Sequence, residues 1–407
     1  METLTAKTCG LVIGFNTRPI VESWRRYFGK QSNLIATVDY FADVEIRACS
    51  DFLFSVLKQA PGEIADRLFH QPPGDYLTEL AEILADEINV GIILLGSGLD
   101  DRPDLWRRLS SLGELSGNDP DRLAVLRSRE NLFKVAKKIG LAVPKFNFFS
   151  SFSEFEEKAP QFEFPFIVRR TGGGGGSNIF KCSSEAEAAQ AAHSLLHHFG
   201  QGIIESYEEG IPASVSILGS SERVVVLSFN EQLIGCKSSF CPTEFTFCGN
   251  ITPLRLPSET QDCLTEHFTK LGEELRLLGS NGVDFILRND EAYILELNPR
   301  FQGSLEPIEL ANDVNLVEAH LKCFSDGLDE PPAPKQVAVR KILYAPKQIT
   351  VPELSASLAK DRPIPGVILS QKSPFVSVLA QGKTRADALR ELRQKEQIIW
   401  KKMGVEL

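Results

Sequence analysis

The segment from Gly282 to Asn298 constrains the fold most strongly, because its sequence predicts two strands joined by a short turn. Side chains along a β-strand point alternately to opposite faces. A three-residue turn centred on Asp290 would place Asp284 directly opposite Glu296. One face of this predicted hairpin is apolar and consists of Phe285, Leu287, Tyr293, Leu295 and Leu297. The other face brings Asp284, Glu296 and Asn298 together.

The polar face of this predicted hairpin has two interpretations. Two carboxylates directly opposite each other on neighbouring strands repel, so their pairing favours a bound cation. Carboxylate and amide oxygens are the hard ligands that Mg²⁺ takes beside nucleotide phosphates. The alternative is a solvated outer face that carries two ordinary charges. Asp284, Glu296 and Asn298 are therefore candidate magnesium ligands, and both interpretations of this face stay open.

A run of five glycines, Gly172 to Gly176, lies between two segments typical of short strands, 164–170 and 178–181. A loop without Cβ atoms lets backbone N–H groups approach phosphate oxygens closely. Arg169 and Arg170 come just before it. The run is not a Walker A loop, because no Gly-Lys-Ser/Thr follows. A phosphate-covering hairpin and a flexible linker are the two alternatives.

The N-terminal region alternates between predicted strands (10–15, 34–38 and 90–95) and helical segments such as 19–28. This alternation predicts a parallel sheet whose ligands bind beyond the carboxyl ends of the strands. The loop 14–19 lacks the G-x-G-x-x-G pattern of dinucleotide-binding proteins.

Further along the chain, Ser128 suits the N-cap of a helix that ends at Gly140. Helices are also predicted at 184–198 and 259–277, with a strand-rich stretch at 203–255 between them. Three prolines at 331, 332 and 334 predict a linker before a smaller α/β tail.

Composition excludes several classes of protein. The 407 residues carry a net charge of −10, which argues against binding to a nucleic-acid backbone or an anionic membrane surface. No apolar run approaches the roughly 20 residues of a membrane span. The eight cysteines lack zinc-finger spacing. We therefore expect reduced thiols and a cytoplasmic protein.

The order of these features resembles the ATP-grasp superfamily. A basic strand, the glycine loop, the segment Ile203 to Gly210 and the acidic hairpin follow one another, and Asn298-Pro299-Arg300 closes the series. Residues 335–390 resemble the small carboxyl-terminal module of biotin-carboxylase-like members. The N-terminal segments 14–19, 39–43 and 96–100 are similar to a branch of predicted ATP-dependent carboligases.

The resemblance implies an α/β protein with an ATP-grasp fold in three parts. These are an N-terminal Rossmann-like (pre-ATP-grasp) domain at 1–120, an ATP-grasp domain at 121–330 with its lid at about 140–203, and a C-terminal α/β module at 331–407.

The same resemblance implies roles for individual residues. Asp284, Glu296 and Asn298 would hold Mg²⁺, or Mn²⁺ as an alternative ion, against the phosphates of ATP. Arg300 falls where biotin-carboxylase-like members place an arginine at the acyl-phosphate site, and it is the predicted catalytic residue. The residues that the resemblance assigns to ATP are Arg129, Arg169, Gly172, Gly173, Gly174, Gly175, Gly176, Glu205, Tyr207 and Glu208.

The chain departs from the family pattern at three of its positions. Arginine stands at 129 and 169, where the family usually has lysine. Arginine keeps the charge but binds phosphate as a planar fork and not as a point charge. The usual ribose-binding acid falls near Pro212.

The resemblance implies an ADP-forming ligase that joins a small-molecule carboxylate to an amine through an acyl phosphate. A biotin-carboxylase-like enzyme acting through carboxyphosphate and a non-catalytic nucleotide-binding regulator are the alternatives. Neither nucleic acid nor membrane is an expected partner, while a homo-oligomer and the identity of both substrates stay open. Glu306 and Glu309 are further candidates for substrate contact.

Overall fold

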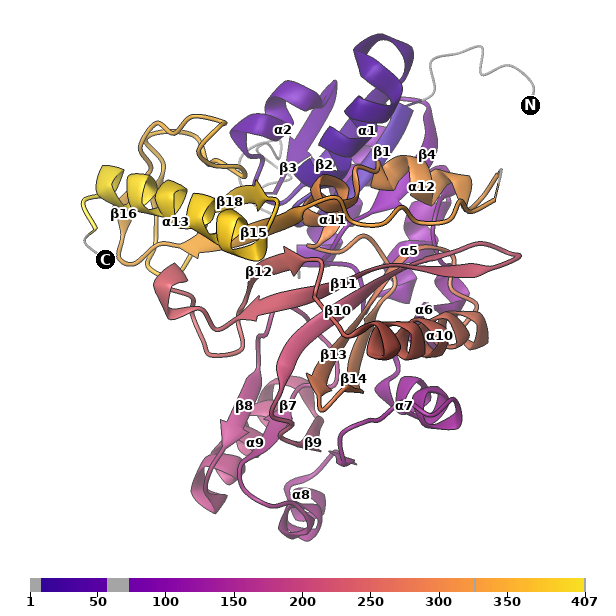
Figure 1. Cartoon of the computed structure of the whole chain (residues 1–407), viewed down its shortest axis with the longest axis vertical. Helices are drawn as coiled ribbons and strands as arrows, with labels where there is room; N and C mark the ends of the chain where they lie inside the picture. The colour runs from indigo at the N-terminus through magenta and orange to yellow at the C-terminus, as the bar shows by residue number, and fades with distance from the viewer. Residues whose placement is uncertain (1–8, 57–72, 326, 406–407) are drawn as a thin grey trace.

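The computed structural model describes residues 9–56, 73–325 and 327–405. These residues form three main sheets, and a small fourth sheet pairs β16 with β17. Figure 1 shows the N-terminal sheet at the top, a long antiparallel sheet across the middle and a smaller lobe below. The predicted α/β architecture is confirmed, because a parallel N-terminal sheet precedes antiparallel sheets.

The N-terminal sheet is parallel, with the strand order β3-β2-β1-β4-β5. Its strands are β1 (Cys9–Gly14), β2 (Leu34–Asp39), β3 (Phe52–Ser55), β4 (Val90–Leu95) and β5 (Glu114–Leu115). The helices of this region are α1 (Arg18–Ser32), α2 (Val44–Cys49), α4 (Pro73–Ala85) and α5 (Pro103–Ser110). Successive residues of β1 serve opposite faces: Leu11 packs in the cluster with α4 and α5, whereas Val12 packs in the cluster with α1.

The central sheet has seven strands in the order β14-β13-β10-β11-β12-β15-β18, and all its pairs are antiparallel. The strands are β10 (Ile211–Gly219), β11 (Val224–Ile234), β12 (Phe247–Thr252), β13 (Gly279–Arg288), β14 (Glu291–Asn298), β15 (Val337–Tyr344) and β18 (Pro374–Gly382). The predicted C-terminal module therefore contributes two strands to the same sheet as the acidic hairpin. Its remaining elements are β16 (Ile349–Thr350), β17 (Ile368–Leu369) and α13 (Arg385–Lys402).

A four-stranded antiparallel sheet in the order β6-β9-β7-β8 forms the lower lobe. Its elements are β6 (Phe146–Phe149), α8 (Phe152–Lys158), β7 (Phe166–Arg169), β8 (Ile179–Cys182), α9 (Glu185–Phe199) and β9 (Gly202–Ser206). Phe166 and Val168 on β7 pack in one cluster with Ala188 and Ala192 of α9. The other face of β7, which carries Ile167 and Arg169, lines a cavity.

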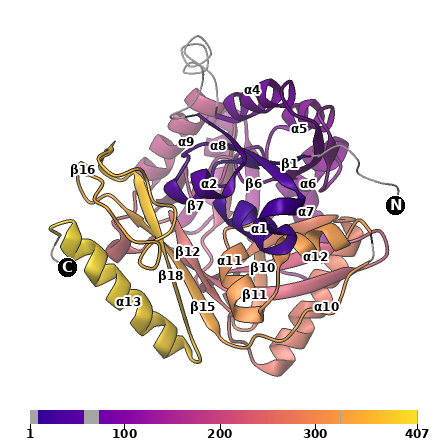
Figure 2. The same cartoon turned by 90° about the horizontal axis from the view of Figure 1, so that it is seen from above.

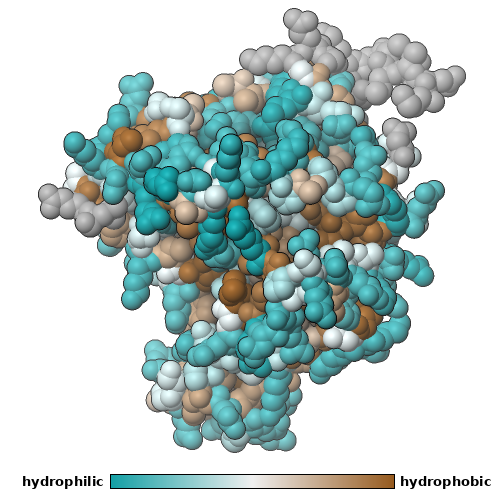
Figure 3. Space-filling view, viewed as in Figure 1, coloured by the Kyte–Doolittle hydropathy of each residue, from teal (hydrophilic) through white to brown (hydrophobic). Residues whose placement is uncertain are grey.

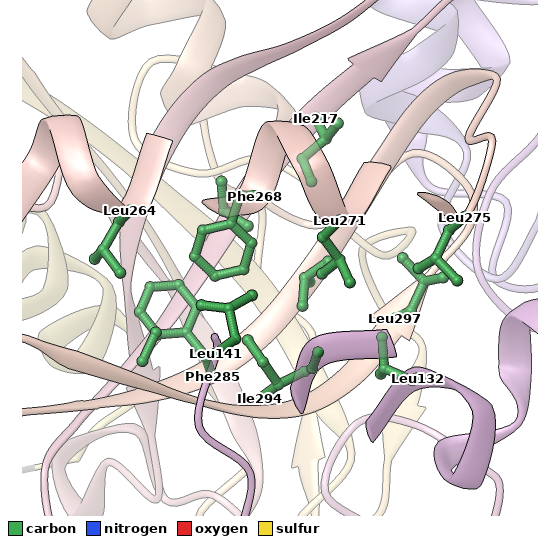
Figure 4. Packing of buried hydrophobic residues seen from close by; sticks show 14 of the residues in the cluster. Leu132, Leu141, Ile217, Leu264, Phe268, Leu271, Leu275, Phe285, Ile294 and Leu297 are labelled. Atoms are coloured by element: carbon green, nitrogen blue, oxygen red, sulfur yellow. The ribbon is translucent and has the colours of Figure 1, made fainter. Parts of the chain in front are cut away.

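The hydrophobic core of the central sheet lies under α10 (Ser258–Glu274), as Figure 4 shows. Leu264, Phe268 and Leu271 recur at helical spacing and form one apolar stripe. They meet Phe285 and Ile294 of the hairpin. Each such fully buried side chain stabilises the fold by about 1.5–3 kcal/mol. The hairpin is thereby fixed on a rigid base. The remaining helices are α6 (Leu123–Arg127), α7 (Arg129–Lys138), α11 (Leu305–Asn312) and α12 (Leu316–Lys322).

The hairpin differs from its prediction in the turn. Arg288 pairs with Glu291, so the turn has two residues, Asn289 and Asp290, with φ of 52° and 64°. A β-bulge next to Asp284 then adds one residue to β14 and restores the predicted pairing of Asp284 with Glu296.

The bulge also changes the apolar face of β14. Ala292, Ile294 and Leu297 are the residues of β14 that enter the core. Leu295, which the prediction placed in the core, lines the cavity, and Tyr293 lies outside the core cluster. The prediction of the apolar face was therefore wrong for Tyr293 and Leu295 and correct for Leu297.

The face drawn in Figure 3 is mostly hydrophilic, with apolar side chains showing in scattered patches. None of the helices that the structure describes combines the length and the apolar character that a membrane span requires.

Candidate active site

A cavity of about 910 Å³ lies where the three main sheets meet. The N-terminal sheet contributes the loops after β1, β2 and β4, and the lower lobe contributes β7, the glycine loop and residues 205–208. The central sheet supplies one polar wall, which includes Asp284, Glu296 and Asn298. Of the predicted site residues, all ten assigned to ATP and all three assigned to the metal line this cavity, as does Arg300.

Asp284 is surrounded by amide groups. The amide Nε2 of Gln232 donates to its Oδ1 at 2.9 Å, and the amide Nδ2 of Asn298 donates to its Oδ2 at 3.0 Å. Burial raises the pKa of Asp284 to about 7, and the neighbouring carboxylate of Glu296 adds to the effect. Within the described ranges the buried acid Asp284 forms no direct ion pair, so it would gain from a cation.

Glu296 has the opposite environment, because both of its carboxylate oxygens accept from arginines. Arg127 Nη1 lies 2.8 Å from Oε1, and Arg129 Nη2 lies 2.7 Å from Oε2. Burial alone would raise the pKa of Glu296, but Arg127 and Arg129 outweigh it and lower the pKa to about 2. Glu296 therefore carries its negative charge at neutral pH.

Sequence reasoning missed Arg127. Its only local signal is its place two residues before Arg129, just ahead of the N-cap Ser128. The side chain is 7 % exposed and also pairs with Asp101 at 2.8 Å. Arg127 contacts three segments of the chain, at Asp101, Gly173 and Glu296. Because these segments lie far apart in the sequence, no local spacing could predict the cluster.

Arg169 and Glu205 form a buried ion pair with Nε and Oε2 2.7 Å apart. Arg129 lies close to this pair, and its side chain also donates to the carbonyl oxygen of Thr171. Burial lowers the pKa of Arg129 to about 10, and the charge of Arg169 contributes. Two guanidinium groups held so close together would be stabilised by an anion.

Tyr207 and Glu208 continue the strand from Glu205 along the cavity wall. The ammonium group of Lys181 lies over the ring of Tyr207, 3.8 Å from its centroid. Glu208 accepts a hydrogen bond from Arg288 Nη1 at 2.7 Å. These contacts fix the segment between the lower lobe and the central sheet.

The glycine loop is anchored to two other parts of the chain. The N–H of Gly173 donates to Asp101 Oδ2 at 2.6 Å, and its carbonyl accepts from Arg127 Nη2 at 3.1 Å. Gly176 has a φ of 81°, and a Cβ there would lie 1.8 Å from the carbonyl oxygen of Phe245. No other residue type fits at 176 without a shift of the backbone.

Arg300 lies at the edge of the acidic hairpin. Its Nε donates to Asp100 Oδ1 at 2.7 Å, and its Nη2 donates to Asn298 Oδ1 at 3.3 Å. The predicted catalytic arginine is thereby connected to the residues nominated for the metal.

Glu306 and Glu309 do not line the cavity. Glu306 pairs with Arg18 at 2.5 Å, and Glu309 pairs with Arg26 on the same helix, α1. Both acids join α11 to α1, so the geometry gives them a structural role and not the predicted contact with substrate.

The polar side chains of the acidic hairpin suit a divalent cation that takes most of its ligands from groups other than protein side chains. Among the described residues, no group of three or more His, Cys, Asp or Glu side chains converges as a metal site. Asp284 and Glu296 supply two carboxylates and Asn298 one amide oxygen, which are hard ligands of the class that Mg²⁺ prefers. Burial is the main cause of the raised pKa of Asp284, and the charge of Arg300 opposes it only in part.

Comparison with known families identifies the central part of the chain. Residues 129–304 match a family model described as an ATP-grasp domain. The chain carries an ATP-grasp domain. The matched range contains the glycine loop, the acidic hairpin and Arg300, so the predicted resemblance to the ATP-grasp superfamily is confirmed for this part of the chain.

Similarity extends beyond the ATP-grasp domain. An uncharacterized protein of Methanocaldococcus jannaschii is 24% identical over 374 residues, which cover 91% of this chain and 88% of that protein.

Two solved structures show the same fold at low identity. One is the biotin carboxylase domain of Hydrogenobacter thermophilus 2-oxoglutarate carboxylase, in complex with MgADP, ADP and bicarbonate. Its TM-score is 0.72 at 15% identity, with 95% of this chain and 89% of that chain covered. The other is the L-amino acid ligase of Bacillus licheniformis, with a TM-score of 0.72, 15% identity, and 96% and 97% of the two chains covered.

Proposed function

We propose that this protein is an ATP-dependent ligase that joins a carboxylate to an amine through an acyl phosphate. One observation carries the proposal: three arginines and two carboxylates, all with largely buried side chains, meet at one place beside the glycine loop, and all of them except Arg127 line the cavity. The residues are Arg127, Arg129, Arg169, Asp284 and Glu296. Such a cluster suits a polyanion bound together with a cation.

The nucleotide would lie between the lower lobe and the central sheet. Four apolar side chains line the cavity there, namely Ile167, Ile179, Ile286 and Leu295. They would contact the two faces of the base, and residues 205–208 would lie at its edge. The phosphates would then extend toward Arg129 and Arg169, where an anion is favoured because two guanidinium groups lie close together.

Mg²⁺ would be held by Asp284, Glu296 and Asn298, with Mn²⁺ as an alternative ion. When bound, the metal supplies charge neutralisation on the transferring phosphoryl group. Arg127 and Arg129 balance Glu296 in its absence. On nucleotide binding we expect these arginines to turn toward the phosphates, which frees the carboxylate oxygens.

The reaction has two steps. A substrate carboxylate oxygen attacks the γ-phosphorus of ATP, the bond to the β–γ bridging oxygen breaks, and an acyl phosphate and ADP form. An amine then attacks the acyl carbon, phosphate leaves, and the amine loses a proton. Arg300, fixed by Asp100, would stabilise the negative charge that develops on the acyl oxygen. The glycine loop would exclude water from the acyl phosphate.

A second candidate is carboxylation through carboxyphosphate. It is supported by the likeness in fold to a biotin carboxylase domain that was crystallised with bicarbonate. The two candidates share the first step and differ in the acid that is phosphorylated. A nucleotide-binding regulator without turnover is the third, and the complete set of Asp284, Glu296 and Asn298 in the cavity favours an enzyme over it.

The direct experiment incubates the protein with ATP, Mg²⁺ and pooled carboxylates and amines while ADP is measured. We expect ADP release that requires both pools. ADP release with bicarbonate alone would favour the carboxylase, and nucleotide binding without any ADP release would favour the regulator. A Glu296→Gln variant controls for contaminating ATPases.

A further inference from the structure

The cavity extends beyond the acidic hairpin into a region that the nucleotide proposal does not use. Its walls come from the loop after β2, from β11, β12 and β15, and from residues 361–377. Figure 2 shows α2 beside the C-terminal strands, and Arg362 indeed pairs with Glu45 of α2 at 2.6 Å. Two polar side chains in these walls lack partners.

The first is Asp43, which lines the cavity and is 5 % exposed. The preceding turn is fixed by Asp39, whose Oδ1 accepts from the N–H groups of Phe41 and Ala42 at 2.8 and 2.7 Å. Asp43 begins α2, yet its side chain does not cap that helix. No hydrogen bond or ion pair of its carboxylate occurs within the described ranges. A buried carboxylate of this kind is costly unless a cation or donor meets it.

The charges around Asp43 are predominantly negative. Burial raises its pKa well above the usual value, and Asp361 and Asp39 add to the effect. The charge of Arg18 opposes this effect in part, but Arg18 and Arg340 are both paired with Asp361, and neither forms an ion pair with Asp43 within the described ranges. A ligand that brings a positive charge would therefore be stabilised here.

The second is Asn250 on β12, which is 1 % exposed and lines the same cavity. Among the described residues, its buried Oδ1 has no hydrogen-bond partner. An unsatisfied buried amide oxygen costs about 1–3 kcal/mol, so its retention indicates a ligand that donates a hydrogen bond.

Asp43 and Asn250 belong to one region of the cavity. Asn250 pairs in register with Arg340, and Arg340 Nη2 lies 2.8 Å from Asp361, the acid that raises the pKa of Asp43. Asn16, in the loop after β1, lines the same cavity and also has a buried Oδ1 without a partner. The unpartnered atoms of Asn16 and Asn250 are amide oxygens, which accept hydrogen bonds and therefore favour a ligand that carries N–H groups.

An apolar surface adjoins Asn250. On the same face of the sheet, Ile234 and Phe247 pair across β11 and β12, and Ile342 follows Arg340 by two residues on β15. Val367 and Leu369 line the cavity from the C-terminal region. A ligand in this region would therefore contact apolar side chains along its body.

We propose that Asp43 and Asn250 bind the amino group of the acceptor substrate, and that its apolar body lies against Ile234, Phe247 and Ile342. This inference rests on the proposed function and specifies its amine: a primary amine with an apolar chain. Asn16 would accept a further N–H of the same group.

The test measures binding of three small probes by calorimetry, with the full-length protein saturated with Mg²⁺ and a non-hydrolysable ATP analogue. Butylamine has the proposed group, butanoate carries the opposite charge, and tetramethylammonium has the charge without N–H donors. We expect butylamine to bind at least about tenfold more tightly than either of the others. Equal or tighter binding of butanoate or tetramethylammonium would overturn the inference.

Two variants separate a binding role from a structural one. Asp43→Asn keeps the shape and removes the charge, and Asn250→Leu keeps the volume and removes the amide. Each should weaken butylamine binding by about tenfold or more. Asn250→Leu should also melt at a higher temperature, because it removes an unsatisfied polar group. Asp290→Asn, at the exposed turn of the hairpin, is the matched control and should bind butylamine as the wild type does.

The outcomes distinguish this inference from the proposed function. Wild-type binding of butylamine by both Asp43→Asn and Asn250→Leu would overturn the inference alone, provided that the ATP analogue binds. Failure of the wild-type protein to bind the analogue in the presence of Mg²⁺ would overturn the proposed function and this inference together.

Discussion

Asp284 and Glu296 lie directly opposite each other on β13 and β14, yet their carboxyl groups have opposite electrostatic environments. Glu296 is held by two arginines, and its pKa is about 2. Among the described residues, the side chain of Asp284 accepts hydrogen bonds from two amides, and burial raises its pKa to about 7. One acid of the pair is therefore permanently charged, and the other becomes charged near neutral pH, where a cation would fix its charge.

Asp284→Asn should stabilise the metal-free protein at pH 8. The pKa of Asp284 is higher in the folded state than the ordinary value of 3.8, so its contribution to stability is complete below pH 4 and is lost as the pH rises to about 7. The Asp284→Asn variant has no carboxyl group at this position, so it does not lose this stability as the pH rises. Its advantage in free energy of unfolding should therefore be near zero at pH 4 and reach a plateau above pH 7, with an upper bound of about 4 kcal/mol.

Denaturant unfolding in EDTA at several pH values measures this advantage. Asp290→Asn, on the exposed turn, should show no such dependence on pH. An advantage of Asp284→Asn that stays constant from pH 4 to 8 would contradict the raised pKa.

Glu296→Gln should abolish ATP turnover. The substitution removes one of the two carboxylates proposed for Mg²⁺ and takes away the negative charge that Arg127 and Arg129 share. Breaking a buried ion pair costs about 3–5 kcal/mol, so circular dichroism must show that the variant is folded. Glu291→Gln, the same change at the exposed start of β14, is the control. ADP release by folded Glu296→Gln at the wild-type rate would disprove the metal assignment.

Arg169→Ala should raise the KM for ATP far more than Arg170→Ala. Both arginines line the cavity, but Arg169 is 7 % exposed and lies beside Arg129, whereas the guanidinium of Arg170 lies 4.5 Å from the ring centroid of Phe199. A charge-assisted contact with phosphate is worth about 1.5–3 kcal/mol, which corresponds to roughly a tenfold to hundredfold change in KM. Steady-state kinetics on both variants decide the order, and the reverse order would place the phosphate contact on Arg170.

Asp101→Asn should loosen the glycine loop. The Asp101 carboxylate accepts from the N–H of Gly173 and pairs with Arg127, so the variant weakens two contacts that hold the loop over the cavity. Hydrogen exchange across 172–176 should be faster in Asp101→Asn than in the wild type, and slower in both when an ATP analogue is added. Glu114→Gln, an exposed acid on β5, is the control. If the ATP analogue does not change the rate of hydrogen exchange in the loop, the five glycines form a linker and not a phosphate-binding loop.

The sequence predicted which segments form this site better than it predicted which side chains contact one another. The strand ends, the glycine loop and the pairing of Asp284 with Glu296 follow from short-range patterns, and the structure has all three. The apolar face of β14 could not be predicted, because the bulge shifts the alternation by one residue between Ile294 and Glu296. A two-residue turn with a bulge and a three-residue turn without one give the same pairing at Asp284.

Side-chain contacts between residues far apart in the sequence explain the remaining differences between the prediction and the structure. Arg127 reaches Glu296 across 169 positions of sequence, and Glu306 reaches Arg18 across 288. No periodicity encodes such contacts, since they depend on how α1, α6 and α11 pack against the sheets. The resemblance to the ATP-grasp superfamily predicted Arg129 as a site residue, because it stands at a position where the family usually has lysine. The resemblance made no prediction for Arg127.

The most direct test of the central claim follows oxygen from the substrate into phosphate. The protein is incubated with ATP, Mg²⁺, pooled amines and carboxylates that carry ¹⁸O, and the inorganic phosphate is analysed by mass spectrometry. If an acyl phosphate forms and an amine cleaves it, the phosphate contains one ¹⁸O and appears with ADP and an amide. Unlabelled phosphate, or the release of AMP and pyrophosphate, would contradict the proposed ligase.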